Sequence, residues 1–419
     1  MSEARRKAAL AREASRELAQ APSRARSEAI LAAASLIEGR VATICEANEA
    51  DVARARARGM AEPLVDRLLL DEGRLRAIAA SLREIARQDD PVGQVVGGRT
   101  LESGVRVEQV RVPLGVVAVI YEARPNVTAD AFALCLRSGN ACVLKGGSAA
   151  SASCEAIVAC CREALGSAGL SPEGVQYVAD DASHSETGEL LRARGLVDVL
   201  VPRGGAELIR SCVEGATVPV IETGTGNCHV YLHRDADVGR AVSIVVNAKC
   251  SRPGVCNAAE SLLVDACAAE RLLPPVLRAL AERGVALVGD DLAREVALRS
   301  SVDMAAATEL DWGTEYLDLK MSVRCVDGVE EAVAHVNRYG TGHSEAIVSE
   351  SYAACEAFLA GVDAAAVYAN ASTRFTDGGV FGLGGEIGIS TQKLHARGPM
   401  GATALTTTKY LVRGEGQVR

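Results

Sequence analysis

The first 90 residues carry apolar positions at helical spacing. Over residues 4–90, apolar side chains such as Ala29, Ala33 and Ile37 recur every three or four positions among arginines and glutamates, which predicts amphipathic helices. The pattern stops at the sequence DDPVG (residues 89–93), because proline and glycine end a helix. No motif with chemical function falls in this region, so we expect it to be scaffold.

Residues 95–112 change to the period of a strand. The valines at 105 and 107 alternate with charged residues after a predicted turn at Gly97-Gly98, which indicates a half-exposed strand. Such a strand needs a cover, and the β-rich tail at residues 404–412 is expected to pair with the same strand of a neighbouring subunit. We therefore predict a small β oligomerisation arm (97–117 with 399–419) and a homo-oligomer.

Short apolar runs and helices then alternate. Runs at 113–120, 141–145, 175–178 and 197–201 are each followed by a helical segment, which is typical of a doubly wound α/β domain with a buried parallel sheet. A second alternation begins near residue 261 and predicts a second α/β domain. No GxGxxG follows a strand, although glycine pairs stand at two strand-to-helix turns, KGG (145–147) and RGG (203–205).

Composition and charge argue against several classes of binding partner. The chain of 419 residues has 45 basic and 54 acidic side chains and a formal charge of −9, which argues against nucleic acid and against an anionic membrane surface. No apolar run approaches the ~20 residues of a membrane helix, and the charged N-terminus does not read as a signal peptide. The 13 cysteines show no metal-ligand spacing and no CxxC pair, so we expect no metal, no disulfide framework and a reducing cytoplasm.

The sequence KCSRPGVCN (249–257) contains the candidate nucleophile, Cys256. A thiol becomes nucleophilic where its pKa is lowered and its sulfur is accessible. Lys249 and Arg252 bring positive charge nearby in sequence, while Pro253 and Gly254 brace a tight turn. Taken alone, the stretch fits a small buried hydrophobic cysteine equally well.

Seven motifs, in order along nearly the whole chain, resemble those of the γ-glutamyl phosphate reductases. This family, also called glutamate-5-semialdehyde dehydrogenases, belongs to the aldehyde dehydrogenase superfamily. The motifs are VPLGVVAVIYEARPNV (112–127), VLKGG (143–147), VPRGGAELI (201–209), IETGTGNCHVYL (221–232), NAKCSRPGVCNAAESLLV (247–264), YGTGHSEAIV (339–348) and EIGISTQKLHARGPMG (386–401).

The resemblance implies a fold and a reaction. The fold would have a cofactor-binding domain (1–96 with 118–240 and roughly 374–398), a catalytic domain (241–373) and the β arm. The reaction would be NADPH-dependent reduction of L-glutamyl 5-phosphate to L-glutamate 5-semialdehyde and phosphate, the second step from glutamate to proline. Because acyl phosphates of glutamate are labile, the glutamate 5-kinase that makes the substrate would be a useful partner.

The resemblance also implies residue roles. Cys256 matches the catalytic thiol, and Asn126 matches the asparagine whose amide helps to form the oxyanion hole. Lys145 matches the lysine at the adenosine ribose, where its charge would suit the 2′-phosphate of NADP. Gly204 and Gly205 match the turn that faces the cofactor pyrophosphate.

Glu315 matches the glutamate that anchors the nicotinamide ribose. Three further residues have open roles. Glu222 matches the glutamate that activates water in hydrolytic relatives; in a reductase it would be held away from the thioester, handle protons, or be a structural acid. Arg252 or Lys249 would pair with the leaving phosphate or the thiolate, or be solvated loop charges.

Several alternatives stay open at this level. A non-phosphorylating semialdehyde dehydrogenase would use Glu222 as a base, and a thioester-forming acyltransferase or a non-catalytic binding paralogue would use no hydride. Cys250 stands where the family more usually has threonine or a similar residue, and is interpreted as a core cysteine or an oxidation-sensitive thiol. The histidines in the matching motifs are interpreted as structural: His229, His343 and His395.

Overall fold

The computed structural model describes residues 1–179 and 185–419. The chain divides into two compact units. Residues 1–223, 382–388 and 399–419 form unit 1, and residues 224–381 and 389–398 form unit 2. The units separate between Thr223 and Gly224. Residue 241, where the resemblance implies the start of the catalytic domain, lies inside a helix of unit 2.

Unit 1 begins with five helices, as the apolar spacing predicted. Their buried faces are rich in alanine, leucine and isoleucine, and two of them have side-chain N-caps, Ser2 accepting from the Arg5 N–H and Asp71 from the Arg74 N–H. The helices are α1 (Glu3–Leu18), α2 (Ser23–Gly39), α3 (Val41–Ala57), α4 (Glu62–Leu68) and α5 (Glu72–Arg87).

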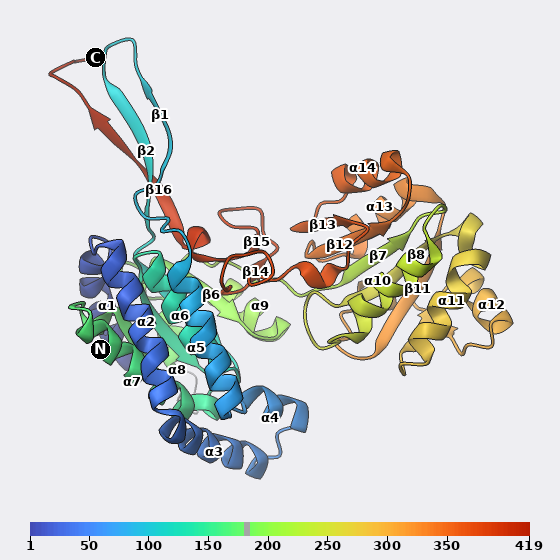
Figure 1. The fold of residues 1–419 in the computed structure, drawn as a ribbon, viewed down its shortest axis with the longest axis horizontal. Helices are drawn as coiled ribbons and strands as arrows, with labels where there is room; N and C mark the ends of the chain where they lie inside the picture. Colours follow the sequence, from blue (N-terminus) through green and yellow to red (C-terminus); the bar gives the residue numbers. More distant parts are fainter. Residues whose placement is uncertain (180–184) are drawn as a thin grey trace. The chain divides into compact units, whose positions relative to one another are not determined.

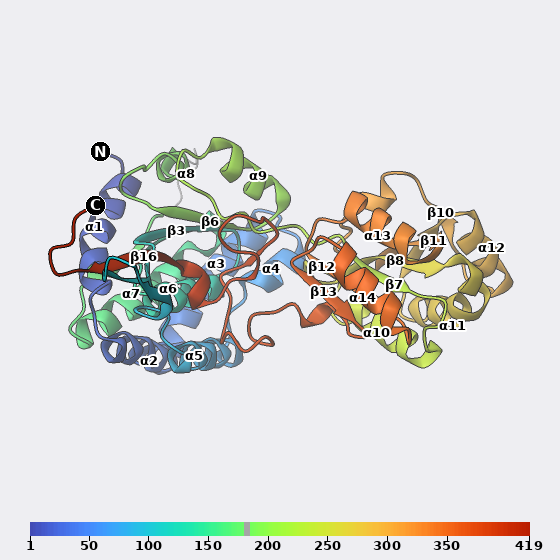
Figure 2. The ribbon, with the colours of Figure 1, turned by 90° about the horizontal axis from the view of Figure 1, so that it is seen from above.

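A four-stranded parallel sheet forms the centre of unit 1, in the order β5-β4-β3-β6. All residues of β3 and β4 are buried, as expected for continuous apolar runs covered on both faces. Helices α1, α8 and α9 lie on one side of the sheet, and α6 and α7 on the other (Figure 2). The elements are β3 (Val116–Tyr121), α6 (Asn126–Arg137), β4 (Ala141–Gly146), α7 (Ser151–Ser167), β5 (Val175–Tyr177), α8 (Ser185–Leu191), β6 (Val199–Arg203) and α9 (Ala206–Gly215).

The β arm differs from its prediction in two respects. Strand β1 (Val95–Thr100) runs through Gly97-Gly98, so the predicted turn there is wrong and the chain reverses after Thr100 instead. Strand β16 (Thr406–Arg413) pairs antiparallel with β2 (Arg106–Pro113) of the same chain, not of a neighbour. Alternation marks a strand as half-exposed but does not say which strand covers it. The three strands extend away from the helices of unit 1 (Figure 1).

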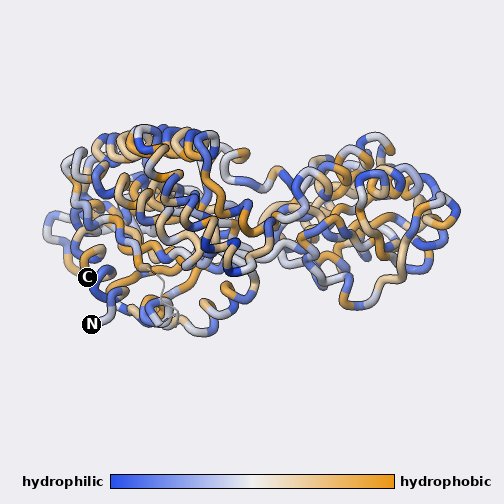
Figure 3. Tube along the Cα trace, turned by 90° about the horizontal axis from the view of Figure 1, so that it is seen from below, coloured by the Kyte–Doolittle hydropathy of each residue, from blue (hydrophilic) through white to orange (hydrophobic). Residues whose placement is uncertain are grey.

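Unit 2 contains a seven-stranded parallel sheet in the order β10-β9-β11-β8-β7-β12-β13. Successive side chains of β7 pack on opposite faces: Val230 and Leu232 join the cluster under α10, α11 and α12, while Tyr231 joins the cluster under α13 and α14. Hydrophobic and hydrophilic stretches alternate along the helices of both units (Figure 3).

The strands of this sheet alternate along the chain with the helices that cover its two faces. They are β7 (Cys228–Leu232), α10 (Val238–Cys250), β8 (Ala259–Asp265), α11 (Ala269–Ala281), β9 (Ala286–Gly289), α12 (Asp291–Arg299), β10 (Ala305–Ala306), β11 (Lys320–Val326), α13 (Gly328–Tyr339), β12 (Ser344–Val348), α14 (Tyr352–Gly361) and β13 (Ala366–Ala369). Two short strands, β14 (Ile389–Ser390) and β15 (Gly398–Pro399), pair with each other. Within the described residues, no helix is both long enough and apolar enough to cross a bilayer.

Candidate active site

Cys256 lies half-buried in the loop 251–258, between the end of α10 and the start of β8. The residue after it is held on two sides. The Asn257 side-chain amide donates to the Thr376 carbonyl at 2.9 Å, and the Thr373 hydroxyl donates to the Asn257 carbonyl at 2.7 Å. These bonds fix the backbone next to the thiol without using the thiol itself.

Gly226 packs against the backbone of this loop. A Cβ atom at Gly226 would lie 1.5 Å from the Cys256 carbonyl oxygen, so only glycine permits the approach. The Gly226 N–H donates to Glu315 Oε1 at 2.7 Å, and burial raises the pKa of Glu315. The carboxylate expected at the nicotinamide ribose thus lies in unit 2, with one oxygen engaged beside the nucleophile loop.

Lys249 is committed to a buried ion pair. Its Nζ lies 2.5 Å from Glu260 Oε2, and both side chains are fully buried. The second carboxylate oxygen, Glu260 Oε1, accepts the Leu317 N–H at 3.2 Å. Burial raises the pKa of Glu260 to about 7, while Lys249 acts in the opposite direction. Lys249 therefore braces the two ends of the nucleophile loop and does not present its charge to a substrate.

Arg252 is exposed in the loop, and a second arginine, Arg374, joins it. The Arg374 Nε donates to Ser251 Oγ at 3.1 Å. Burial lowers the pKa of Arg374, and the charge of Arg252 lowers it further, whereas Asp377 and the Cys256 thiolate raise it. Two guanidinium groups thus lie close enough to repel each other beside the candidate nucleophile.

Asn126 is the first residue of α6 in unit 1, at the carboxyl end of β3. Its side chain is exposed, and Asp130 lies one helical turn later, where Asn126 helps to lower the Asp130 pKa and Ser81 Oγ donates to Asp130 Oδ1 at 3.1 Å. Burial raises the pKa of Asp130 to about 6 despite these bonds and the charge of Arg203. A buried carboxyl group with a raised pKa thus lies one turn from the candidate oxyanion-hole residue, Asn126.

Lys145, Gly204 and Gly205 meet at the same edge of the unit 1 sheet, because β4 and β6 both pair in parallel with β3. The buried Lys145 Nζ donates to the Gly146 carbonyl at 3.3 Å. A Cβ at Gly204 would lie 2.8 Å from the Glu122 carboxylate, and the Gly205 N–H donates to Glu122 Oε2 at 3.0 Å. The ammonium, the glycine turn and the start of α9 fit a ribose and pyrophosphate, although Glu122 occupies that amide here.

Glu222 is half-buried near the end of the first segment of unit 1. Cys256 belongs to unit 2. The role of Glu222, in proton handling, in hydrolysis or in structure alone, therefore stays a prediction.

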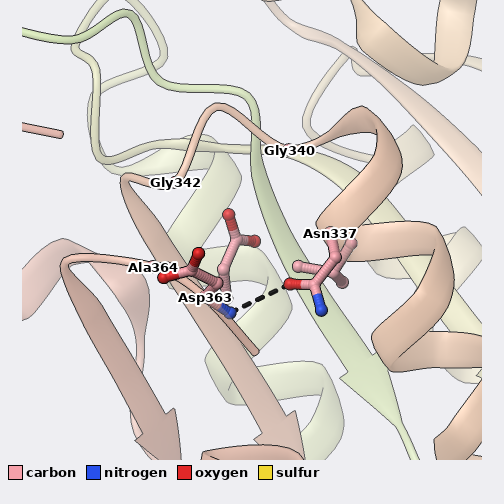
Figure 4. A pocket seen from close by; sticks show the side chains of 7 residues that line it. Asn337, Gly340, Gly342, Asp363 and Ala364 are labelled. Atoms are coloured by element: carbon pink, nitrogen blue, oxygen red, sulfur yellow. Dashed lines mark hydrogen bonds between the residues drawn. The ribbon is translucent and has the colours of Figure 1, made fainter. Parts of the chain in front are cut away.

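A cavity of about 210 Å³ opens in unit 2 near the beginnings of β12 and β13 (Figure 4). Asn337 Oδ1 accepts the Asp363 N–H at 2.9 Å across it, and the buried Glu345 accepts from His229 Nδ1 at 3.0 Å. His229 thus has a structural partner, as interpreted from the sequence. The lining residues, none of them a predicted site residue, are Val336, Asn337, Gly340, Gly342, Glu345, Asp363 and Ala364.

Comparison with known proteins shows the family to which the chain belongs. The aldehyde dehydrogenase family pattern matches residues 1–312. The γ-glutamyl phosphate reductase of Thermobifida fusca is 52% identical over 415 residues, which cover 99% of this chain and 98% of the relative. The chain belongs to the γ-glutamyl phosphate reductase family. The reductase of Listeria monocytogenes is 48% identical over 419 residues, covering 100% of both chains.

Solved structures confirm the α/β fold of the family. The crystal structure of γ-glutamyl phosphate reductase from Thermotoga maritima has a TM-score of 0.96 and 45% identity, with 100% of both chains covered. An acetylating aldehyde dehydrogenase from Geobacillus thermoglucosidasius has a TM-score of 0.70 at 18% identity, over 100% of this chain and 97% of that one, which supports the fold alone. Membership of the reductase family implies an enzyme with a nicotinamide cofactor.

The sequence analysis of this γ-glutamyl phosphate reductase family member did not predict four residues that contact or neighbour the candidate site residues: Glu122, Asp130, Glu260 and Arg374. Glu122 lies in the motif segment YEARPN, directly after a buried strand. A charged residue at that position could have been predicted to lie near the cofactor turn. Asp130 is four residues after Asn126, the spacing of one helical turn. For Glu260 and Arg374 the sequence offered no pairing signal.

Proposed function

We propose that the chain reduces L-glutamyl 5-phosphate to L-glutamate 5-semialdehyde and phosphate with NADPH, in the pathway from glutamate to proline. The observation that carries this proposal is identity near 50% along the whole chain with relatives named γ-glutamyl phosphate reductase. The nucleophile loop supports it, because Cys256 is half-buried on a braced turn with two guanidinium groups nearby.

Cys256 carries the covalent chemistry in this proposal. The thiolate attacks the γ-carbonyl carbon, an S–C bond forms, and the C–O bond to phosphate breaks with its electron pair leaving on phosphate. Asn126 donates a hydrogen bond to the developing oxyanion. NADPH, when bound, supplies the hydride that reduces the thioester carbon. The resulting thiohemiacetal alkoxide reforms a carbonyl and expels the Cys256 thiolate, which restores the enzyme.

We assign the cofactor contacts residue by residue, as the family motifs imply. Lys145 would face the adenosine ribose and the 2′-phosphate of NADP, Gly204 and Gly205 the pyrophosphate, and Glu315 the nicotinamide ribose. Use of the Gly205 amide by pyrophosphate requires the Glu122 carboxylate to leave it, since two anions would otherwise compete for one N–H.

We further propose a cytoplasmic homo-oligomer. All 13 cysteines are free, which suits a reducing compartment. The arm exposes Val95, Val96, Tyr410 and Val412, with 61, 45, 66 and 61% of each residue accessible, and a second copy would cover such side chains. Transfer of the labile substrate from glutamate 5-kinase is a proposal that rests on substrate chemistry alone.

Phosphate dependence tests the reaction against its closest alternative. The purified protein is supplied with glutamate 5-semialdehyde and NADP, with and without phosphate, and NADPH formation is followed. We expect turnover only with phosphate, because the thioester is released by phosphate and not by water. Turnover indifferent to phosphate would favour a hydrolytic semialdehyde dehydrogenase with Glu222 as base. Absence of both turnover and nicotinamide-cofactor binding would favour a non-catalytic paralogue.

Replacement of Asn126 tests the oxyanion hole. We expect Asn126→Ala to lower kcat by about 100- to 1,000-fold with an unchanged melting temperature, because one donor to the oxyanion is lost. Asn126→Asp, which keeps the shape but loses the donor, is expected to be equally poor. An Asn126→Ala enzyme that keeps more than a fifth of its kcat would contradict the assignment.

A further inference from the structure

We propose that Arg374 and Arg252 form an oxyanion subsite beside Cys256, which binds a phosphate or carboxylate group of the substrate. The proposal rests on the proposed function for the identity of that substrate. Arg374 is new to the site, because it is 117 positions from Asn257 in sequence and carries no motif spacing.

Arg374 is built into the nucleophile loop at both of the loop's ends. Its Nε donates to Ser251 Oγ at 3.1 Å, and its carbonyl oxygen accepts the Asn257 side-chain amide at 3.5 Å. The preceding residue, Thr373, donates to the Asn257 carbonyl at 2.7 Å. The backbone that carries the guanidinium is therefore fixed relative to the backbone that carries the thiol.

Within the described part of the chain, neither arginine is held in an ion pair, although the charge of Asp377 acts on Arg374. Over residues 1–179 and 185–419, neither Arg252 nor Arg374 takes part in an ion pair, although many arginines of the chain do, Arg234 with Asp265 among them. Arg374 is half-buried beside the exposed Arg252, and burial and the charge of Arg252 depress its pKa more than Asp377 and Cys256 raise it, so its charge is held at a cost. An oxyanion shared between them would reverse this cost.

Lys249 does not compete for this role, because its ammonium is buried against Glu260. Arginine also suits the task better than lysine, since its planar fork matches the two oxygens of a phosphate or carboxylate. The substrate carries both groups: the phosphate on the carbon that Cys256 attacks, and the α-carboxylate at the far end of the glutamyl chain. The shared chemistry is an oxyanion, and kinetics separates its two sources.

The kinetic arm uses Arg374→Gln, Arg374→Lys and Arg252→Gln in the oxidative direction. If the subsite binds phosphate, KM for phosphate rises about 10- to 100-fold in Arg374→Gln, with KM for the semialdehyde little changed and partial recovery in Arg374→Lys. If it binds the α-carboxylate, KM for the semialdehyde rises instead. Arg294→Gln, an exposed arginine at 3.3 Å from Asp291 on α12, is the matched control and should change neither constant.

The second arm needs no turnover, so it separates failure of this proposal from failure of the proposed reaction. Alkylation of Cys256 by iodoacetamide is timed with and without inorganic phosphate. We expect phosphate, or L-glutamate for a carboxylate subsite, to protect the wild-type thiol and the Arg294→Gln thiol, but not the Arg374→Gln thiol. Unchanged KM values with equal protection would overturn the subsite. Slower alkylation alone, without changes in KM or protection, would also overturn it, because the arginines would then serve only the thiolate.

Discussion

Replacement of Cys256 by serine is expected to lower phosphate-dependent NADP reduction by at least about 10⁴-fold while leaving the fold intact. A serine hydroxyl is almost wholly protonated at neutral pH, whereas a thiol with an ordinary pKa of ~8.5 already supplies some thiolate. The ester that serine would form also accepts hydride less readily and expels its oxygen less readily than a thioester expels sulfur. Removal of a covalent nucleophile typically abolishes nearly all catalysis.

The matched control is Cys250→Ser, six positions earlier in the same motif. Cys250 is half-buried at the end of α10, where burial raises its pKa, and its loss should leave kcat within a few-fold. Iodoacetamide followed by peptide mass analysis should label Cys256 ahead of buried thiols such as Cys154 and Cys212, whose pKa values burial raises to about 11. Activity that survives in Cys256→Ser but is lost in Cys250→Ser would show that Cys250, and not Cys256, is the nucleophile.

The sequence was sufficient for the elements whose signal is local. The helices of residues 4–90 and the buried strands β3 and β4 follow from apolar spacing and continuous apolar runs, and the family follows from ordered motifs. The predicted turn at Gly97-Gly98 failed because glycine is also tolerated within an exposed strand, here β1.

Features that depend on tertiary pairing were not predictable in the same way. β16 covers β2 of its own chain although hydrogen-bonded residues such as Gln109 and Thr408 are 299 positions apart, and alternation contains no information about that choice. Lys249 looked like a loop charge because lysine is seldom fully buried. Only its proximity to Glu260, across the loop, explains the burial. Arg374 entered the site for the same reason, through a loop from a distant segment.

The buried pair itself carries the second large expectation. Lys249→Met should destabilise unit 2 by about 3–5 kcal/mol at pH 8, because it leaves the Glu260 carboxylate buried without its cation. The measurement is the free energy of unfolding of the full chain in urea, with Arg294→Gln as a surface-pair control that should change it by less than about 1 kcal/mol. A loss below 1 kcal/mol in Lys249→Met would show that the pair contributes no more than a surface one.

The sign of the pH dependence distinguishes this cause from a simple packing defect. Burial raises the pKa of Glu260 from 4.5 to about 7, so the folded state holds a proton that the unfolded state releases, and Glu260 makes unfolding easier as pH rises from about 4.5 to about 7. The groups that face it are Lys249, which lowers this pKa, and Glu315, which raises it.

Without Lys249 the pKa of Glu260 should rise further and extend this loss of stability above pH 7. Lys249→Met should therefore lie closer to wild type at pH 5.5, where Glu260 is protonated and neutral, than at pH 8. In the double variant Lys249→Met/Glu260→Gln the additional pH dependence caused by Lys249→Met should vanish, since position 260 no longer titrates. A penalty that is equal at both pH values in Lys249→Met would instead assign the loss to packing around the lysine side chain. Because the pair joins the end of α10 to the start of β8, the same variants should change the rate of Cys256 alkylation in parallel with stability.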